Sequence, residues 1–144
     1  MSPRRARPPS ARLRGAPVVE RVLLDSSALL ALLRQEPGAE QVTAVLPGAA
    51  ISAVNAVEVV GKLVQWGLAP GRAAGMLRDL DLPMPPFEAN AVDAAGALLG
   101  RHRGRLSLGD CACIATGRLL GLPLLTTDRA WAELDLGAEV RLIR

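Results

Sequence analysis

Four acidic residues lie at the boundaries of apolar segments and helical patterns. Asp25 and Asp128 follow apolar segments, and Glu58 and Asp110 lie near the starts of helical patterns. In an α/β fold such positions lie near the carboxyl ends of the strands, where ligands bind. Burying several carboxylates together is costly unless a cation or a set of hydrogen-bond donors compensates their charge. Their joint placement therefore predicts a site for a hard divalent cation and chemistry on phosphodiester bonds.

Each of these acids also has a purely structural interpretation. Asp25 and Asp128 could cap the helices that follow them. Asp110 could complete a capping box with Ser107, and Glu58 could pair with the lysine four residues later. Taken one at a time, the acids favour these structural roles, and only the placement of all four together favours a shared site.

The elements that must position the acids follow an alternating pattern. Strands are predicted at 22–24, 49–52, 123–126 and 139–143, with 82–84 as a further short strand. Helices are predicted at 28–33, 39–46, 53–66, 70–80, 88–102, 107–120 and 129–134. The apolar strands lack period-two alternation, which indicates a parallel sheet covered on both faces. We therefore expect an α/β protein with three α/β/α layers, in which four to five short parallel strands are flanked by about seven helices.

The composition predicts a single domain behind a basic leader. The chain has 144 residues, half of them hydrophobic, which is enough for one core and too few for two. Residues 1–17 carry five arginines and no acid, so the net charge of +3 becomes −2 for the remaining 12 basic and 14 acidic residues. We expect a disordered Arg/Pro-rich leader at 1–17 and one folded domain at 18–144. The leader could attract RNA, result from a misassigned start site, or be inert.

Several classes of protein are disfavoured. No apolar run approaches the roughly 18 residues that span a bilayer, so a soluble, cytoplasmic protein without a membrane partner is expected. Cys111 and Cys113 are predicted to be core residues of a reducing compartment. A glycine-rich phosphate loop is missing after the first strand, which argues against nucleotide-binding folds. Three aromatic residues are too few for a base-stacking module.

Four motifs in order resemble those of the PIN-domain nucleases, and specifically the VapC-type toxins of toxin–antitoxin pairs. The motifs are Asp25-Ser-Ser after a strand, Ser52-x-x-Asn-x-x-Glu58, Leu106-Ser-Leu-Gly-Asp110 and Leu124-Leu-Thr-Thr-Asp128-Arg. The resemblance runs from about Val18 to the end of the chain. The sequence departs from the family in its leader and in Asn55, where many members carry serine or threonine.

The resemblance implies a PIN-like nuclease domain that cleaves RNA with Mg²⁺ or Mn²⁺ as the toxin of a pair. A small VapB-like antitoxin would inhibit it, and the toxin would form a homodimer. Asp25 and Asp110 would be the direct metal ligands, while Glu58 and Asp128 would complete the acidic pocket, often through water. Such a site matches the habit of Mg²⁺, which is held by one or two carboxylates together with waters and substrate phosphate.

Other polar residues have lesser predicted roles. The supporting residues are Ser26 and Thr127, which adjoin the strand-end acids, and Asn55; capping of turns is an equally good explanation for the two hydroxyls. The predicted RNA-binding residues are Arg129, Arg101, Arg103 and Arg105. Solvation and interaction with helix ends would also explain these arginines. The main alternative function is a non-catalytic module that binds RNA or protein on the same fold.

Overall fold

The computed structural model describes residues 19–144, and the predicted leader lies outside the described residues. The strands are β1 (Val22–Leu24), β2 (Ala49–Ile51), β3 (Leu124–Thr126) and β4 (Val140–Leu142). The α-helices are α1 (Ser26–Leu33), α2 (Ala39–Val45), α3 (Ala53–Gln65), α4 (Pro70–Asp79), α5 (Val92–Arg101) and α6 (Leu108–Leu120). Short 3₁₀ helices are η2 (Leu46–Gly48), η3 (Ala89–Ala91) and η4 (Arg129–Glu133). The predicted α/β class is confirmed, and most predicted boundaries agree within one or two residues.

The four strands form one parallel sheet in the order β2-β1-β3-β4. The chain leaves β1 toward β2 on one side and returns to β3 on the other side, so the direction of winding reverses between β1 and β3. Parallel α/β sheets bind ligands outside the carboxyl ends of the strands at such a reversal. Asp25 follows β1 directly, and Asp128 lies two residues beyond β3. The topology therefore brings these two acids to neighbouring strand ends.

The further short strand expected at 82–84 does not form. The carbonyl groups of Pro83 and Pro85 accept hydrogen bonds from Ile51 N and Ala53 N, both at 3.0 Å, so this segment runs beside β2. Proline has no N–H with which to donate in return. The segment therefore accepts hydrogen bonds from the β2 side without donating any in return from its prolines, and the sheet has four strands.

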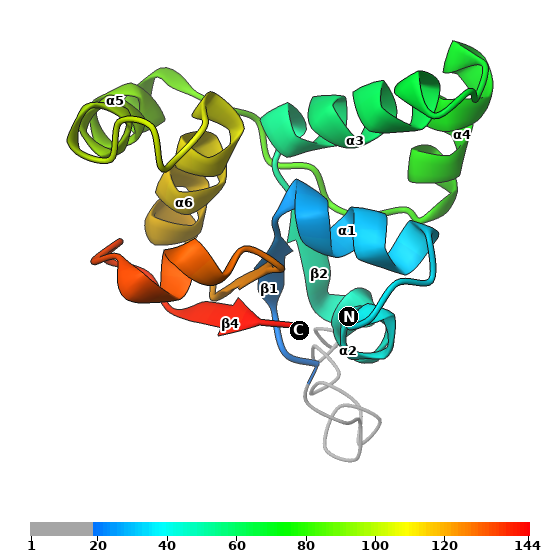
Figure 1. Cartoon of the computed structure of the whole chain (residues 1–144), viewed down its shortest axis with the longest axis horizontal. Coiled ribbons are helices and arrows are strands. Elements are labelled where there is room, and N and C mark those ends of the chain that lie inside the picture. Colours follow the sequence, from blue (N-terminus) through cyan, green and yellow to red (C-terminus); the bar gives the residue numbers. More distant parts are fainter. Residues whose placement is uncertain (1–18) are drawn as a thin grey trace, which may run out of the picture.

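Helices cover both faces of the sheet (Figure 1). One core contains Val22, Leu24, Ile51 and Leu125 from the sheet together with residues of α1, α2, α3 and α4. Leu23 and Leu124 face the opposite way and pack in a second core with α5, α6 and Trp131. The strand residues are buried on both sides, which explains why their sequences are continuously apolar. The predicted three layers are confirmed.

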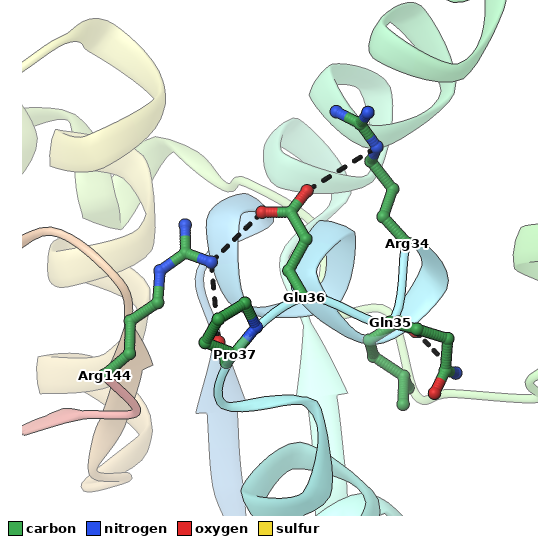
Figure 2. Close-up of polar contacts among 6 residues, drawn as sticks. Arg34, Gln35, Glu36, Pro37 and Arg144 are labelled. Carbon is green, nitrogen blue, oxygen red and sulfur yellow. Dashed lines mark hydrogen bonds and ion pairs between the residues drawn. The ribbon is translucent and has the colours of Figure 1, made fainter.

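The C-terminal residue ties the end of the chain to the turn between α1 and α2 (Figure 2). Arg144 Nη1 lies 3.0 Å from Glu36 Oε2 and 3.4 Å from the carbonyl oxygen of Pro37. The other oxygen of Glu36 is 3.5 Å from Arg34 Nε. The guanidinium group of Arg34 in turn lies 4.2 Å from the ring centre of Trp66, which follows α3. These contacts link α1, the end of α3 and the end of β4.

Cys111 and Cys113 are buried, free thiols within α6, as expected for core residues. Among residues 19–144, no helix is both long and apolar enough to cross a bilayer.

Candidate metal centre

Asp25 holds the N-cap position of α1, yet its side chain makes no capping hydrogen bond. Its Oδ2 instead accepts hydrogen bonds from the hydroxyl groups of Ser27, at 2.7 Å, and Thr126, at 2.9 Å. Its Oδ1 has only a long contact of 3.5 Å with the hydroxyl group of Ser26. The residue is 3% exposed. The capping interpretation of Asp25 is therefore wrong, and one oxygen of a buried carboxylate remains available to a ligand.

Burial raises the pKa of Asp25 from its ordinary value of 3.8 to about 6. The two hydroxyl donors oppose this rise, while the negative charges of Asp110 and Glu58 add to it. A buried anion that its neighbours compensate only in part is stabilised by a nearby cation. The surroundings of Asp25 thus favour binding of a positive charge.

Glu58 lies on α3, and its carboxylate approaches Asp25 through a shared hydroxyl group. Its Oε1 accepts hydrogen bonds from Asn55 Nδ2 at 2.8 Å and from Ser26 Oγ at 3.2 Å. Among the described residues, no ion pair joins Glu58 to Lys62, so the helical pairing expected from their spacing is absent. Ser26, which is also near Asp25, therefore lies between two acids that are 33 residues apart in the sequence.

Asp110 is the third residue of α6 and forms the predicted capping box with Ser107. Its Oδ2 accepts from Ser107 N at 2.8 Å, and its own N–H donates to Ser107 Oγ at 3.1 Å. Burial is the main cause of the raised pKa of Asp110, to which the charges of Asp128 and Glu58 contribute. Within residues 19–144 the other oxygen, Oδ1, has no hydrogen-bond partner. The cap thus orients the carboxyl group and leaves one oxygen free.

Asp128 caps η4, since its Oδ1 accepts a hydrogen bond from Ala130 N at 2.9 Å. The N–H of Asp128 donates to Thr126 Oγ1 at 3.1 Å, and the same hydroxyl group donates to Asp25. The structural interpretation is confirmed for Asp128. The same contacts nevertheless connect it to the first acid through one threonine.

The predicted supporting residues fit the site unequally. Ser26 and Asn55 both contact Glu58, whereas Thr127 contributes its backbone N–H, which donates to Ser27 Oγ at 3.0 Å. Sequence reasoning missed Ser27 and Thr126, whose hydroxyl groups are the two donors to Asp25. Ser27 lies two residues after Asp25, and Thr126 two residues before Asp128. The even spacing of Thr126 and Asp128 on an extended segment was a usable signal, because it puts both side chains on one side.

The predicted RNA-binding arginines lie at the surface. All four are exposed: Arg101, Arg103, Arg105 and Arg129. Arg105 pairs with Glu133 at 3.4 Å, so part of its positive charge is already balanced.

A 380 Å³ pocket between α1 and α3 opens beside the acids and includes Ser26, Glu58 and Lys62 among its lining residues. Lys62 is the only lysine of the chain and is exposed.

A divalent cation fits the donors that are present. No group of three or more His, Cys, Asp or Glu side chains within 19–144 is arranged so that it could hold a metal ion. Mg²⁺ does not require one, since it is commonly held by one or two carboxylates and keeps several waters. Asp25 and Asp110 each offer one oxygen without a short hydrogen bond, and burial raises the pKa of both. The donor set therefore matches a hard, partly hydrated cation.

The class of the protein follows from comparison with known families. The PIN domain family matches residues 22–136, which is most of the chain, and the protein therefore belongs to that family. The resemblance expected from the four motifs is confirmed.

The similar proteins are named as VapC ribonucleases, and the similar solved structures as toxin–antitoxin complexes. Ribonuclease VapC of Mycolicibacterium smegmatis is 28% identical over 129 residues, covering 81% of this chain and 98% of the relative. Ribonuclease VapC30 of Mycobacterium tuberculosis is 28% identical over 127 residues, covering 80% and 95%. Similar folds include a toxin–antitoxin complex from Klebsiella pneumoniae, with a TM-score of 0.67, 21% identity and coverage of 85% and 98%. DNA-bound VapBC from Salmonella typhimurium has a TM-score of 0.68, 17% identity and coverage of 87% and 99%.

Proposed function

We propose that this protein is a Mg²⁺- or Mn²⁺-dependent endoribonuclease that acts as the toxin of a toxin–antitoxin pair. The observation that carries the proposal is the carboxylate of Asp25, which is buried at the switch point of the sheet with one oxygen available and with the negative charges of Asp110 and Glu58 nearby. The curated relatives named above are ribonucleases, which supports the assignment of the reaction.

In this proposal Asp25 and Asp110 hold the cation through their available oxygens. The cation would lower the pKa of a bound water and offset the negative charge that develops on the phosphate. Glu58 orients the attacking water and accepts its proton, because it shares the hydroxyl group of Ser26 with Asp25, its charge acts on Asp25, and its Oε2 makes no hydrogen bond within residues 19–144. Ser27 and Thr126 keep Asp25 in place by donating to its other oxygen.

RNA would approach across the exposed basic side chains around the acids. Arg129 immediately follows Asp128, and Lys62 lies one helical turn beyond Glu58 in the pocket between α1 and α3. Arg101, Arg103 and Arg105 extend the positive surface at the end of α5. Contacts of this kind bind the phosphate backbone and carry little sequence information.

A small antitoxin is the proposed protein partner, and the toxin itself would form a homodimer. An apolar groove of 550 Å³ is lined by α3, by α4 and by Met84 in the segment after α4. Val57 on α3 is 71% exposed and Met84 is 44% exposed. Amphipathic helices and extended segments bind such grooves. The carboxyl-terminal segment of the antitoxin would place an arginine or lysine near Asp25 and Asp110, where a charged hydrogen bond is strong. The similar solved structures named above are themselves toxin–antitoxin assemblies.

The proposal is tested by incubating the purified protein with total cellular RNA, with EDTA or with added Mg²⁺ or Mn²⁺, and mapping the cut sites. We expect cleavage only with the cation. Asp25→Asn and Asp110→Asn should each reduce the rate by orders of magnitude while circular dichroism remains unchanged. Asp93→Asn, an exposed first-turn acid of α5, is the matched control and should cleave normally.

Two results would change the proposed function. Cleavage of equal rate by wild type and both Asn variants would show that these acids do not hold the cation. RNA binding without any metal-dependent cleavage would instead favour the non-catalytic module on the same fold.

A further inference from the structure

The carboxylate of Glu58 lies directly against the first turn of α6. A Cβ atom built on Gly109 would be 2.3 Å from Glu58 Oε1 and 2.4 Å from both the carboxyl carbon and Oε2. Real side-chain atoms do not approach so closely, so the acid occupies the space that any other residue at this position would fill. The absence of a side chain at Gly109 is what admits Glu58 beside Asp110.

Asn55 holds the Glu58 carboxylate in this space through hydrogen bonds. Its Nδ2 donates to Glu58 Oε1 at 2.8 Å and to the carbonyl oxygen of Gly109 at 3.2 Å. Its Oδ1 accepts from Ser52 Oγ at 2.5 Å. The opposite orientation of the amide would set Oδ1 against a carboxylate and a carbonyl, so only the observed orientation satisfies the contacts. Asn55 is fully buried, and its hydrogen bond to Gly109 connects α3 with α6.

These contacts override the arrangement that Glu58 would otherwise favour. A glutamate side chain has several rotatable bonds, and fixing them costs conformational entropy. Lys62 is available four residues along the same helix, at a spacing that supports an ion pair. The described structure contains no such pair, and Glu58 turns instead toward Ser26 and Gly109. Specific contacts are therefore needed to hold the Glu58 carboxylate against the first turn of α6.

We infer that Gly109 and Asn55 are positioning residues that together hold the Glu58 carboxylate beside the cation site. This inference rests on the proposed function, in which Glu58 orients the attacking water. Gly109 leaves space for the Glu58 carboxylate because it has no side chain. Asn55 donates one hydrogen bond to that carboxylate and another to the carbonyl oxygen of Gly109. Neither residue touches the reacting atoms.

Gly109→Ala is the most direct test, because an added methyl group displaces the Glu58 carboxylate while every hydrogen-bonding side chain of the site stays chemically unchanged. The matched control is Gly96→Ala in α5, where an added Cβ meets nothing within 4 Å. A misplacement of about 1 Å in a catalytic group can cost about 10²-fold in rate. We expect Gly109→Ala to lower kcat by about that factor with little change in KM, and Gly96→Ala to keep wild-type kcat.

A double-mutant cycle separates positioning from general damage. In a Glu58→Ala background there is no carboxylate to displace, so adding Gly109→Ala should change kcat less than twofold. Glu58→Asp should partly restore the rate of Gly109→Ala, because its shorter side chain leaves room for the methyl group. A further 10²-fold loss in the Glu58→Ala background would overturn the inference. So would a melting temperature or Mn²⁺ affinity of Gly109→Ala well below that of Glu58→Ala, which loses the same contacts of the carboxylate, since the excess would indicate damage to α6 itself.

A second measurement is independent of catalysis. The side-chain amide of Asn55 gives its own ¹H–¹⁵N NMR signals, which report its hydrogen bond to Glu58. Gly109→Ala and Glu58→Ala should shift these signals by similar amounts, whereas Gly96→Ala should leave them in place. Unshifted signals in Gly109→Ala would overturn the inference even if the enzyme is active. If wild type does not cleave RNA, the proposed function fails, and the NMR result still decides whether Gly109 and Asn55 position Glu58.

Discussion

Among single residues, Asp25 combines almost complete burial with nearby negative charge. In the unfolded chain its carboxyl group titrates near 3.8, whereas in the folded protein its pKa is about 6. Below pH 3.8 both states hold the proton, and between the two values only the folded state does. Stability of the metal-free protein should therefore fall as pH rises from about 4 to 6 and then level off.

This shift corresponds to roughly 3 kcal/mol of unfolding free energy across that window. Asp110, whose pKa is also raised, contributes in the same direction. Asp25→Asn mimics the protonated form, so it should match wild type near pH 4 and exceed it in stability at pH 7.5. Urea unfolding in EDTA at several pH values measures both curves. Parallel curves for wild type and the variant would show that Asp25 does not titrate in this way.

Metal binding should depend on the same proton. Because Mn²⁺ and the proton compete for the carboxylate of Asp25, the apparent affinity for Mn²⁺ should rise between about pH 5 and 7. Calorimetric titration at fixed ionic strength measures this dependence. A constant affinity over that range would contradict a role for Asp25 as a ligand.

Among the secondary-structure elements, the junction of α2 with the end of β4 depends on one glycine. Gly38 precedes α2 with φ of 97°, and an added Cβ would lie 2.6 Å from the carbonyl oxygen of Ile143. Gly67 has a similar φ of 106° but meets nothing within 4 Å. The two positions therefore separate backbone strain from steric overlap.

Gly38→Ala should destabilise the protein by about 2–4 kcal/mol, because strain and overlap act together. Gly67→Ala should cost only about 1–2 kcal/mol, since strain acts alone. Thermal or urea unfolding measures both losses. Equal losses would show that the contact between Gly38 and Ile143 contributes little to the junction.

For the whole molecule, the net positive charge comes from the leader. Removing residues 1–17 changes the net charge from +3 to −2 and removes five arginines. We expect almost no change in melting temperature, because these residues contain little apolar surface to bury. If the leader binds RNA, its deletion should flatten the salt dependence of affinity, since up to five phosphate contacts are lost. Identical affinity at every salt concentration would mark the leader as inert.

The proposed partner is also a property of the whole surface. Co-expression with a small open reading frame found immediately upstream of the gene should yield a complex that co-purifies and cleaves RNA much more slowly than the free protein. Val57→Asp, in the exposed apolar groove on α3, should weaken that complex without affecting cleavage by the free toxin. An unbound upstream product, or a complex as active as the free protein, would contradict the toxin–antitoxin assignment and leave the nuclease assignment intact.

Much of the fold could be predicted from local patterns along the chain. The run Val22–Leu24 is apolar on both faces because helices cover both sides of the strand, and Gly121 ends α6 in a left-handed conformation that favours glycine. The partners of the capping box, Ser107 and Asp110, are only three positions apart, so their spacing alone predicts it. Local hydrogen bonds and side-chain periodicity depend on neighbours in sequence, which is why these features were predictable.

The arrangement of the candidate site depended on contacts between distant segments. Ser27 and Thr126 are 99 residues apart and meet at Asp25 only because β1 pairs with β3. Glu58 faces Gly109 rather than Lys62 because α3 packs against α6, a choice that helical spacing alone predicts wrongly. The sequence by itself determined which residue types are available and near which strand ends they lie. Only the tertiary structure decided which oxygen of each acid is occupied, because its partners come from other elements.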